Sequence, residues 1–357
     1  MSRRAFCLIL TILLLLTSGC GYPDESGQAE VHEDNAGSAA EEEANEISFF
    51  AMDTYMTIRA WGVDDDDLAA AQELVDDLES RFSTTDDSSE IAILNASGCN
   101  ELSAETLGLL NRALELCELC QGYLDITIYP VVKAWGFTAG DYRVPAAAEL
   151  TELLKLVDWR QVSLSDHLVS LPEGVQVDLG SIAKGYAGDR IIELLRSSGA
   201  EHALLDLGGN IQTLGTKPDG SDWRIAVKDP EKDSIVGVLA VSNRAVITSG
   251  GYERYFIADD GELYWHIMDP ASGYPARNGL ISVSVVGDEG AYCDALSTAL
   301  FVMGEEKAID FWLQRGDFDM VLIREDGTIL ITPDLAESFT LDSGSARPLQ
   351  VIGDVEN

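Results

Sequence analysis

The sequence predicts an α+β fold with a mixed, largely antiparallel sheet and packed helices. From residue 202 onward, short apolar stretches bounded by turn residues dominate, as in strands and hairpins. Earlier in the chain, apolar residues recur at the three- and four-residue spacing of amphipathic helices. The two patterns interleave without a steady strand–helix–strand alternation, which argues against a purely parallel sheet.

Local patterns justify the individual elements. Residues 48–60 alternate like a single strand, and the segment from Asp64 to Asp67 begins a helix because acidic side chains suit the positive end of its dipole. Further helices are predicted over 104–120 and from Pro145 onward. The predicted later strands are 203–207, 211–214, 223–228, 236–242 and 280–286, with hairpin turns at Asp260-Gly261 and Asp326-Gly327.

The charge balance excludes some partners. The 357 residues include 62 Asp+Glu and 23 Lys+Arg, a formal net charge of −39, while 46 % hydrophobic content indicates a folded chain. A pI of about 4.1 is the opposite of a basic nucleic-acid footprint, so no nucleic acid is expected as a partner. An anionic substrate would have to be bound by a metal ion, helix N-termini or a few placed cations.

The N-terminus resembles a lipoprotein signal peptide. Two arginines precede an apolar run over 5–16 that is too short to span a bilayer, and the run ends in small residues before Cys20. Residues 1–19 would be removed and Cys20 would be lipidated. The chain would then be attached to the cell membrane by its lipid anchor only, and it would face outside the cytoplasm. The alternative is an ordinary secretory signal with an incidental cysteine. Residues 20–46 are predicted to be an acidic flexible tether.

The cysteines do not indicate redox chemistry. Cys117 and Cys120 have CxxC spacing, but they continue a helical apolar pattern that favours core positions over a redox pair. No second pair completes a zinc site.

Four segments carry candidate chemistry, each with a structural alternative. Residues 175–189 predict a short strand ending at Asp178, a turn and a helix whose N-terminus and Lys184 suit a phosphate, although small-residue packing gives the same pattern. Residues 205–210 end in Gly-Gly-Asn, a turn sequence that often indicates only a hairpin. Residues 246–254 precede His266, which lies just before a Pro/Gly-rich loop, although a single histidine is often structural.

The fourth segment, residues 291–300, favours a magnesium site. Asp294, Ser297 and Thr298 have the spacing of one helical face, and their oxygen atoms are the ligands that Mg²⁺ prefers. An N-cap aspartate with two satisfied hydroxyls explains the same spacing.

Together these segments resemble the bacterial FAD:protein FMN transferases, the ApbE-like lipoproteins. The resemblance covers about 47–340, and the most specific segment is DLGSIAKGYAGD followed by HIMDP. The shared motifs, in chain order, are Met52-Asp-Thr54, Gly122-Tyr-Leu-Asp125-Ile-Thr127, residues 178–189, Gly208-Gly-Asn210, Thr248-Ser-Gly250, His266…Asp269-Pro270…Gly273 and Asp294…Thr298. The resemblance implies an ApbE-like (T-fold-like) transferase domain over 47–345 and a C-terminal tail over 346–357.

The resemblance implies Mg²⁺-dependent transfer of FMN from FAD to a Thr or Ser hydroxyl of an exported flavoprotein or electron-transport subunit, with release of AMP. His266 would be the general base, and Mg²⁺ would be held by Asp294, Thr298 and the backbone carbonyl of Ser181, with Ser297 beside them. The residues implied to line the FAD site are Met52, Tyr123, Leu124, Asp125, Asp178, Lys184 and Ile267.

Three positions depart from the family pattern. Asp53 replaces a common glycine, Thr85 stands where many relatives carry an aromatic residue, and Ser297 stands where some have a second metal-site aspartate. Two other functions stay open from sequence: an FAD pyrophosphatase that releases FMN and AMP, and a lipoprotein that only binds flavin.

Overall fold

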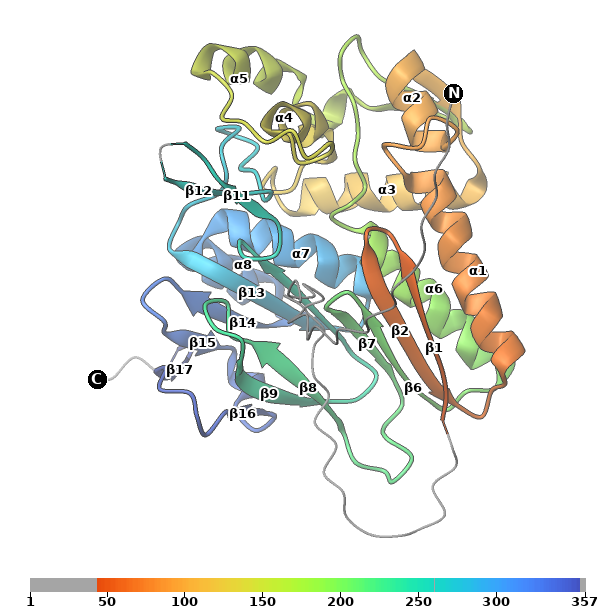
Figure 1. Ribbon diagram of the computed structural model, residues 1–357, viewed down its shortest axis with the longest axis vertical. Helices are drawn as coiled ribbons and strands as arrows, with labels where there is room; N and C mark the ends of the chain where they lie inside the picture. The colour runs from red at the N-terminus through yellow and green to blue at the C-terminus, as the bar shows by residue number, and fades with distance from the viewer. Residues whose placement is uncertain (1–43, 260, 354–357) are drawn as a thin grey trace, which may run out of the picture.

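A nine-stranded sheet forms the centre of the computed structural model, which describes residues 44–259 and 261–353 (Figure 1). Its strand order is β1-β2-β6-β7-β10-β13-β14-β15-β17, and every neighbouring pair is antiparallel except β15–β17. The strands are β1 Asn45–Ala51, β2 Thr54–Trp61, β6 His202–Leu207, β7 Asn210–Leu214, β10 Ala245–Gly250, β13 Leu280–Gly287, β14 Asp319–Arg324, β15 Ile329–Ile331 and β17 Leu349–Val351. The predicted mixed, largely antiparallel sheet is therefore confirmed.

Helices cover one face of this sheet (Figure 1). Helix α7 packs on β10 and β13, α6 on β7, and α1 on β1, around one large apolar core. The helices are α1 Asp65–Phe82, α2 Glu90–Ser97, α3 Ala104–Leu119, α4 Tyr129–Trp135, α5 Ala147–Leu153, α6 Ala183–Ser198, α7 Gly290–Met303 and α8 Glu305–Arg315. The predicted 64–82 and 104–120 helices are confirmed, and the helix expected from Pro145 begins at Ala147.

A smaller sheet covers the opposite face. Its order is β16-β9-β8, and the strands are β8 Trp223–Lys228, β9 Ile235–Val241 and β16 Phe339–Leu341. Alternate side chains of β6 separate the two cores: Leu205 lies in the helical core and Leu204 in the core between the sheets. Both faces of the main sheet are therefore buried. A site must then be formed by residues at the ends of strands and the starts of helices.

Two short sheets complete the fold. The first, in the order β3-β5-β4, comprises β3 Cys99–Glu101, β4 Ser163–Ser165 and β5 Leu168–Ser170. The second is the hairpin of β11 Tyr255–Ile257 and β12 Leu263–Trp265. The Asp326-Gly327 turn joins β14 to β15 as predicted.

The single strand predicted over 48–60 is wrong, because β1 and β2 form a hairpin. Met52 and Asp53 take positive φ angles of 49° and 61°, which reverse the chain so that Ala51 pairs with Thr54. Since the left-handed region favours glycine, the turn gives a physical reason for the glycine that the family resemblance led us to expect at position 53.

The ends of the folded part also differ from the prediction. Strand β1 begins at Asn45, inside the predicted tether, and β17 pairs with β15 where a tail was expected. The Arg347 guanidinium donates to both carboxylate oxygens of Asp229 at 2.7 and 3.0 Å, and both side chains are at least nine-tenths buried. The predicted signal peptide and Cys20 lie outside the described residues.

No helix in the described ranges is both long and apolar enough to cross a bilayer. Cys117 and Cys120 are free and fully buried in the helical core, which confirms their structural interpretation, and burial raises the pKa of both thiols.

Candidate active site

The three residues predicted to share a face of α7 lie together with one serine from β10. Asp294 and Ser297 are buried, and Ser297 Oγ donates to the Asp294 carbonyl at 2.9 Å. The Ser249 hydroxyl lies 2.8 Å from Ser297 Oγ and 3.3 Å from Thr298 Oγ1. The Thr248-Ser-Gly250 motif included Ser249, but the sequence did not place it in this cluster. Its position here depends on the contact between β10 and α7.

The side chains of this cluster present only oxygen atoms. No group of three or more His, Cys, Asp and Glu side chains suited to a metal exists among the described residues. A magnesium ion needs fewer protein ligands when substrate phosphates and waters complete its shell, so one carboxylate with neighbouring hydroxyls fits this hard cation. Both α7 hydroxyls contact Ser249, but the Ser297 hydroxyl also donates to the α7 backbone, which makes it the less available of the two.

Helix α6 brings a cation and a backbone amide to Asp294. The Gly185 amide donates to Asp294 Oδ2 at 2.9 Å, and Lys184 precedes it in the first turn. Burial raises the pKa of Asp294 to about 6, while the Lys184 charge and the Gly185 amide oppose that rise. Lys184 makes no direct ion pair with another described residue, although its charge also opposes the rise that burial causes in the pKa of Glu253.

The segment before α6 differs from the prediction. Residues 175–179 form no regular strand, although the Asp178 amide donates to the Ile126 carbonyl at 2.9 Å. Asp178 Oδ1 accepts from the Gly180 amide at 2.8 Å, and burial raises its pKa. Ser181 lies in the turn just before α6. Asp294 already takes one of the amides predicted as a phosphate site, so this helix start holds a carboxylate of the protein itself.

His266 continues the β11–β12 pairing by one residue. Its backbone amide and its ring Nδ1 lie 3.1 and 3.2 Å from the carbonyl oxygen of Arg254. A carbonyl only accepts, so this contact assigns the ring proton to Nδ1 and leaves Nε2 with a free lone pair. Desolvation and the nearby charges of Arg254 and Lys184 lower the pKa of His266. The geometry is that of a neutral histidine available as a base.

Asp125 organises its own loop. Its Oδ1 accepts from the amide and hydroxyl of Thr127 at 2.9 and 2.6 Å, and its Oδ2 accepts from the Trp159 amide at 3.1 Å. The neighbouring Leu124 is buried, whereas Tyr123 is half-buried with the Lys307 ammonium 4.9 Å from its ring centroid. Among these three predicted flavin-site residues, the Tyr123 side chain is therefore the most accessible.

The other two predicted flavin contacts lie at separate points of the fold. Met52 is half-buried in the β1–β2 turn, and Ile267 is buried in the helical core directly after His266. Thr85 lies in the loop before α2, where its amide donates to Ser83 Oγ at 3.2 Å. Met52 packs against the same apolar core that contains Ile267.

Asn210 is part of the Gly208-Gly-Asn210 motif, but the sequence indicated no role for it. It is buried, and its amide nitrogen has no hydrogen-bond partner among the described residues. The amide lies near enough to Asp294 to lower the pKa of that carboxyl. Either the Asp294 carboxylate or a ligand oxygen would satisfy this buried donor.

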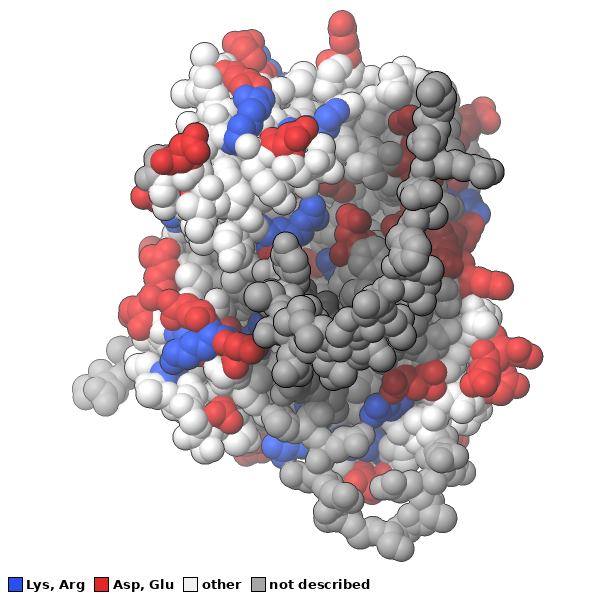
Figure 2. All heavy atoms as spheres, in the orientation of Figure 1, with Lys and Arg blue, Asp and Glu red and all other residues white. Residues whose placement is uncertain are grey.

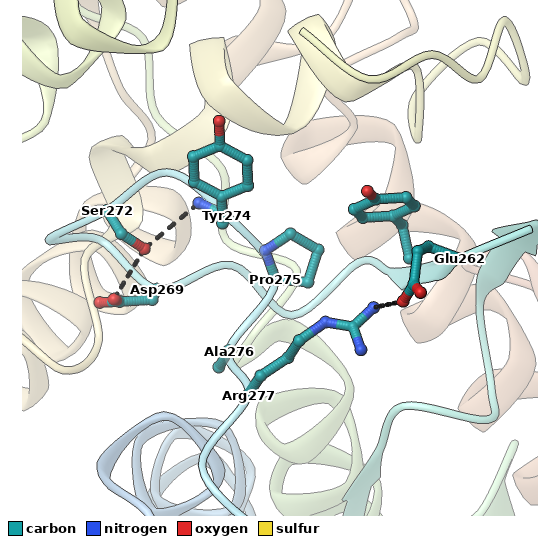
Figure 3. A pocket seen from close by; sticks show the side chains of 8 residues that line it. Glu262, Asp269, Ser272, Tyr274, Pro275, Ala276 and Arg277 are labelled. Carbon is teal, nitrogen blue, oxygen red and sulfur yellow. Dashed lines mark hydrogen bonds and ion pairs between the residues drawn. The ribbon is translucent and has the colours of Figure 1, made fainter. Parts of the chain in front are cut away.

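A surface groove of about 460 Å³ borders the loop that follows His266 (Figure 3). The Ser272 hydroxyl donates to Asp269 at 2.8 Å, and Arg277 reaches toward Glu262 across the opposite side. On the face drawn in Figure 2, acidic side chains are distributed around the whole outline.

Gly185→Ala tests the close approach of α6 and α7. An added Cβ would lie 2.2 Å from the Gly290 carbonyl oxygen and 2.8 Å from Asp294 Cβ, so backbone must move. We expect urea unfolding to show a loss of about 1–3 kcal/mol in the free energy of unfolding. Gly108→Ala in α3 is the control, because its Cβ meets nothing within 4 Å and alanine favours a helix. Equal stability of the Gly185→Ala variant and the wild type would contradict the packing described.

Comparisons with known proteins match most of this chain. The ApbE family model matches residues 52–322. An FAD:protein FMN transferase of Klebsiella pneumoniae is 38 % identical over 226 residues, covering 62 % of this chain and 69 % of the relative, and that of Treponema pallidum is 37 % identical over 256 residues, covering 66 % and 70 %. The ApbE protein of Thermotoga maritima superimposes with a TM-score of 0.76 at 34 % identity, covering 80 % of this chain and 96 % of that structure. The flavin transferase ApbE of Vibrio cholerae gives 0.74 at 28 % identity, with 83 % and 100 % covered. The chain belongs to the ApbE family.

Proposed function

We propose that this chain catalyses the Mg²⁺-dependent transfer of FMN from FAD to a Thr or Ser hydroxyl of an acceptor protein, with release of AMP. The relatives named FAD:protein FMN transferase support flavinyl transfer as the reaction class. The observation that carries the chemistry is the contact of His266 Nδ1 with the Arg254 carbonyl, since it leaves Nε2 free to accept a proton.

The reaction exchanges the phosphoanhydride bond of FAD for a phosphoester bond to the acceptor. The acceptor oxygen attacks the phosphorus that bears riboflavin, and the bond from this phosphorus to the oxygen shared with AMP breaks. His266 Nε2 takes the hydroxyl proton, and AMP leaves with the electron pair of the broken bond. Lys184 supplies a positive charge for the phosphate oxygens, and the Asn210 amide offers a further donor in the same region.

Asp294, Thr298 and the Ser181 carbonyl would hold the magnesium ion. When bound, the ion would neutralise charge on the pyrophosphate and on the leaving AMP. The bond from the Gly185 amide to Asp294 Oδ2 supports this assignment, because it fixes the orientation of the carboxylate.

We also propose that the enzyme acts at the outer face of the cell membrane on an exported flavoprotein or electron-transport subunit. The support is the signal-like run before Cys20 and the acidic segment that follows it.

The direct test is to incubate the chain from residue 44 onward with FAD and MgCl₂, with and without a peptide that carries a Ser/Thr-Gly-Ala-Thr-like target. We expect AMP to appear together with a peptide heavier by one FMN. AMP formation at the same rate without peptide would indicate a pyrophosphatase. Bound FAD without any AMP would indicate a flavin-binding protein.

Asp294→Ala should abolish the Mg²⁺-dependent release of AMP, because it removes the only carboxylate of the proposed ligand set. Asp294→Asn is the matched variant, since its amide oxygen can still accept from Gly185 and preserve the fold. AMP release is measured against MgCl₂ concentration, with circular dichroism as a check of folding. Full activity of either variant at low Mg²⁺ would disprove the ligand assignment.

His266→Ala should leave FAD bound and slow transfer by about 10²–10⁴-fold, the usual contribution of a general base. The control is His167→Ala, because the His167 ring makes a similar contact with the Leu102 carbonyl at 3.3 Å in the separate β3-β5-β4 sheet. Peptide labelling is followed by mass spectrometry. Undiminished labelling by the His266 variant would remove this residue from the role of base.

A further inference from the structure

Asp189 joins two helices that both carry site residues. It projects from α6, and its two carboxylate oxygens accept from the Gly290 and Ala291 amides at 2.6 and 2.9 Å. These are the first two amides of α7, and the N-cap residue of α7, Glu289, provides no side-chain cap. A residue 101 positions away in sequence therefore caps this helix.

A second bond lies one turn earlier in α6 and one turn later in α7. Gly185 precedes Asp189 by four residues in α6, and Asp294 follows Gly290 by four residues in α7. The Gly185 amide donates to Asp294 Oδ2, so the two bonds hold the same turn of each helix at its two ends. Sliding or rotation of one helix against the other would break at least one of them.

Gln212 of β7 packs against both helices at the point where they meet. Its Nε2 donates to the Gly185 carbonyl at 2.8 Å, and a Cβ on Gly290 would lie 1.8 Å from the same nitrogen. A Cβ on Gly188 would lie 2.3 Å from it. The helices and the sheet meet here without space for an alternative register.

We propose that Asp189 is a positioning residue for flavinyl transfer, which holds α7 against α6 and thereby fixes the Asp294 carboxylate beside Lys184. The inference rests on the proposed function, because it assigns Asp294 to the magnesium site. The hydrogen bonds of Asp189 within the described structure go to the α7 backbone, so it acts on Asp294 through that backbone.

The surroundings of Asp189 explain why this carboxylate depends on α7. It lines a groove of about 480 Å³ in which Arg112 donates to Glu289 at 2.9 and 2.6 Å, and in which Arg190 bonds to Glu105 and Glu193. Burial and the charges of Glu289 and Glu193 raise the pKa of Asp189 to about 7, and the two α7 amides are the groups that lower it. The amides of α7 are therefore its principal stabilising partners.

Asp189→Asn tests the proposal, because an amide oxygen can accept one bond while the amide nitrogen faces a second donor. Mn²⁺ is the probe, and its dissociation constant is measured by calorimetry without FAD or acceptor. We expect the constant to rise about 10–100-fold, the usual effect of removing a partner that orients a metal ligand. The Mg²⁺ concentration for half-maximal AMP release should rise in parallel, while the dissociation constant for FAD stays unchanged.

Asp189→Ser is the second variant, since a serine hydroxyl still caps a helix and favours folding. Its Mn²⁺ affinity should lie between those of the wild type and the asparagine variant. Ser89→Ala is the control, because it removes the side-chain cap of α2, where Ser89 Oγ accepts from the Ala92 amide at 2.9 Å, away from α6 and α7. The control should lose stability and keep the wild-type affinity for Mn²⁺.

Wild-type Mn²⁺ affinity in folded Asp189→Asn and Asp189→Ser proteins would overturn the positioning role. Failure of the proposed function gives a different result, in which the wild-type protein binds Mn²⁺ and FAD but releases no AMP. The calorimetric comparison of the variants then still tests whether Asp189 positions Asp294.

Discussion

The hydrogen bond from the Gly185 amide to the Asp294 carboxylate is the contact on which the rest of the site depends. It requires α6 and α7 to approach so closely that neither Gly185 nor Gly290 could carry a side chain without backbone movement. The same approach places Lys184 near Asp294, while packing of α7 on β10 places the α7 hydroxyls near Ser249. The close packing of small residues therefore determines the electrostatics of the site, because a buried carboxylate needs hydrogen-bond donors and a cation close by.

This arrangement suits a chain of formal charge −39 that acts on an anionic dinucleotide. Several arginines of the described structure are paired with acidic side chains, as in Arg324 with Glu305 and Arg347 with Asp229. Lys184 is spared such a direct pair and lies in the first turn of a helix, where backbone amides add to its positive potential. Local placement of a few positive groups therefore replaces an overall basic surface, and repulsion of FAD is expected to slow association most at low salt.

The sequence predicted those parts of the fold that depend on local patterns. Helix α1 was recognisable because Asp64 caps its first turn and apolar residues mark one face, and the strands after residue 202 were bounded by turn residues. The β1–β2 turn was missed because Asp53 lacks the usual glycine signal and the alternation continues through it. Strand β17 was missed because three residues pair across the sheet with β15, a contact that no local pattern records.

The same distinction applies to the site. The spacing of Asp294, Ser297 and Thr298 was sufficient to place them on one helical face, and the resemblance pointed to His266. The roles of Ser249, Asp189 and the Arg254 carbonyl could not be predicted, since each depends on contacts between separate elements. The predicted role of Asp125 in flavin binding stays a prediction, although its carboxylate is already engaged by Thr127 and Trp159.

The most direct test of the account is a double-mutant cycle on Lys184 and Asp294, with transfer to the acceptor peptide as the readout. If the α6–α7 contact makes the two side chains one unit, Lys184→Met should cost far less kcat/KM in the Asp294→Asn background than in the wild type. Equal losses in both backgrounds would show that the two groups act independently, and would contradict the claim that the helix contact builds the site.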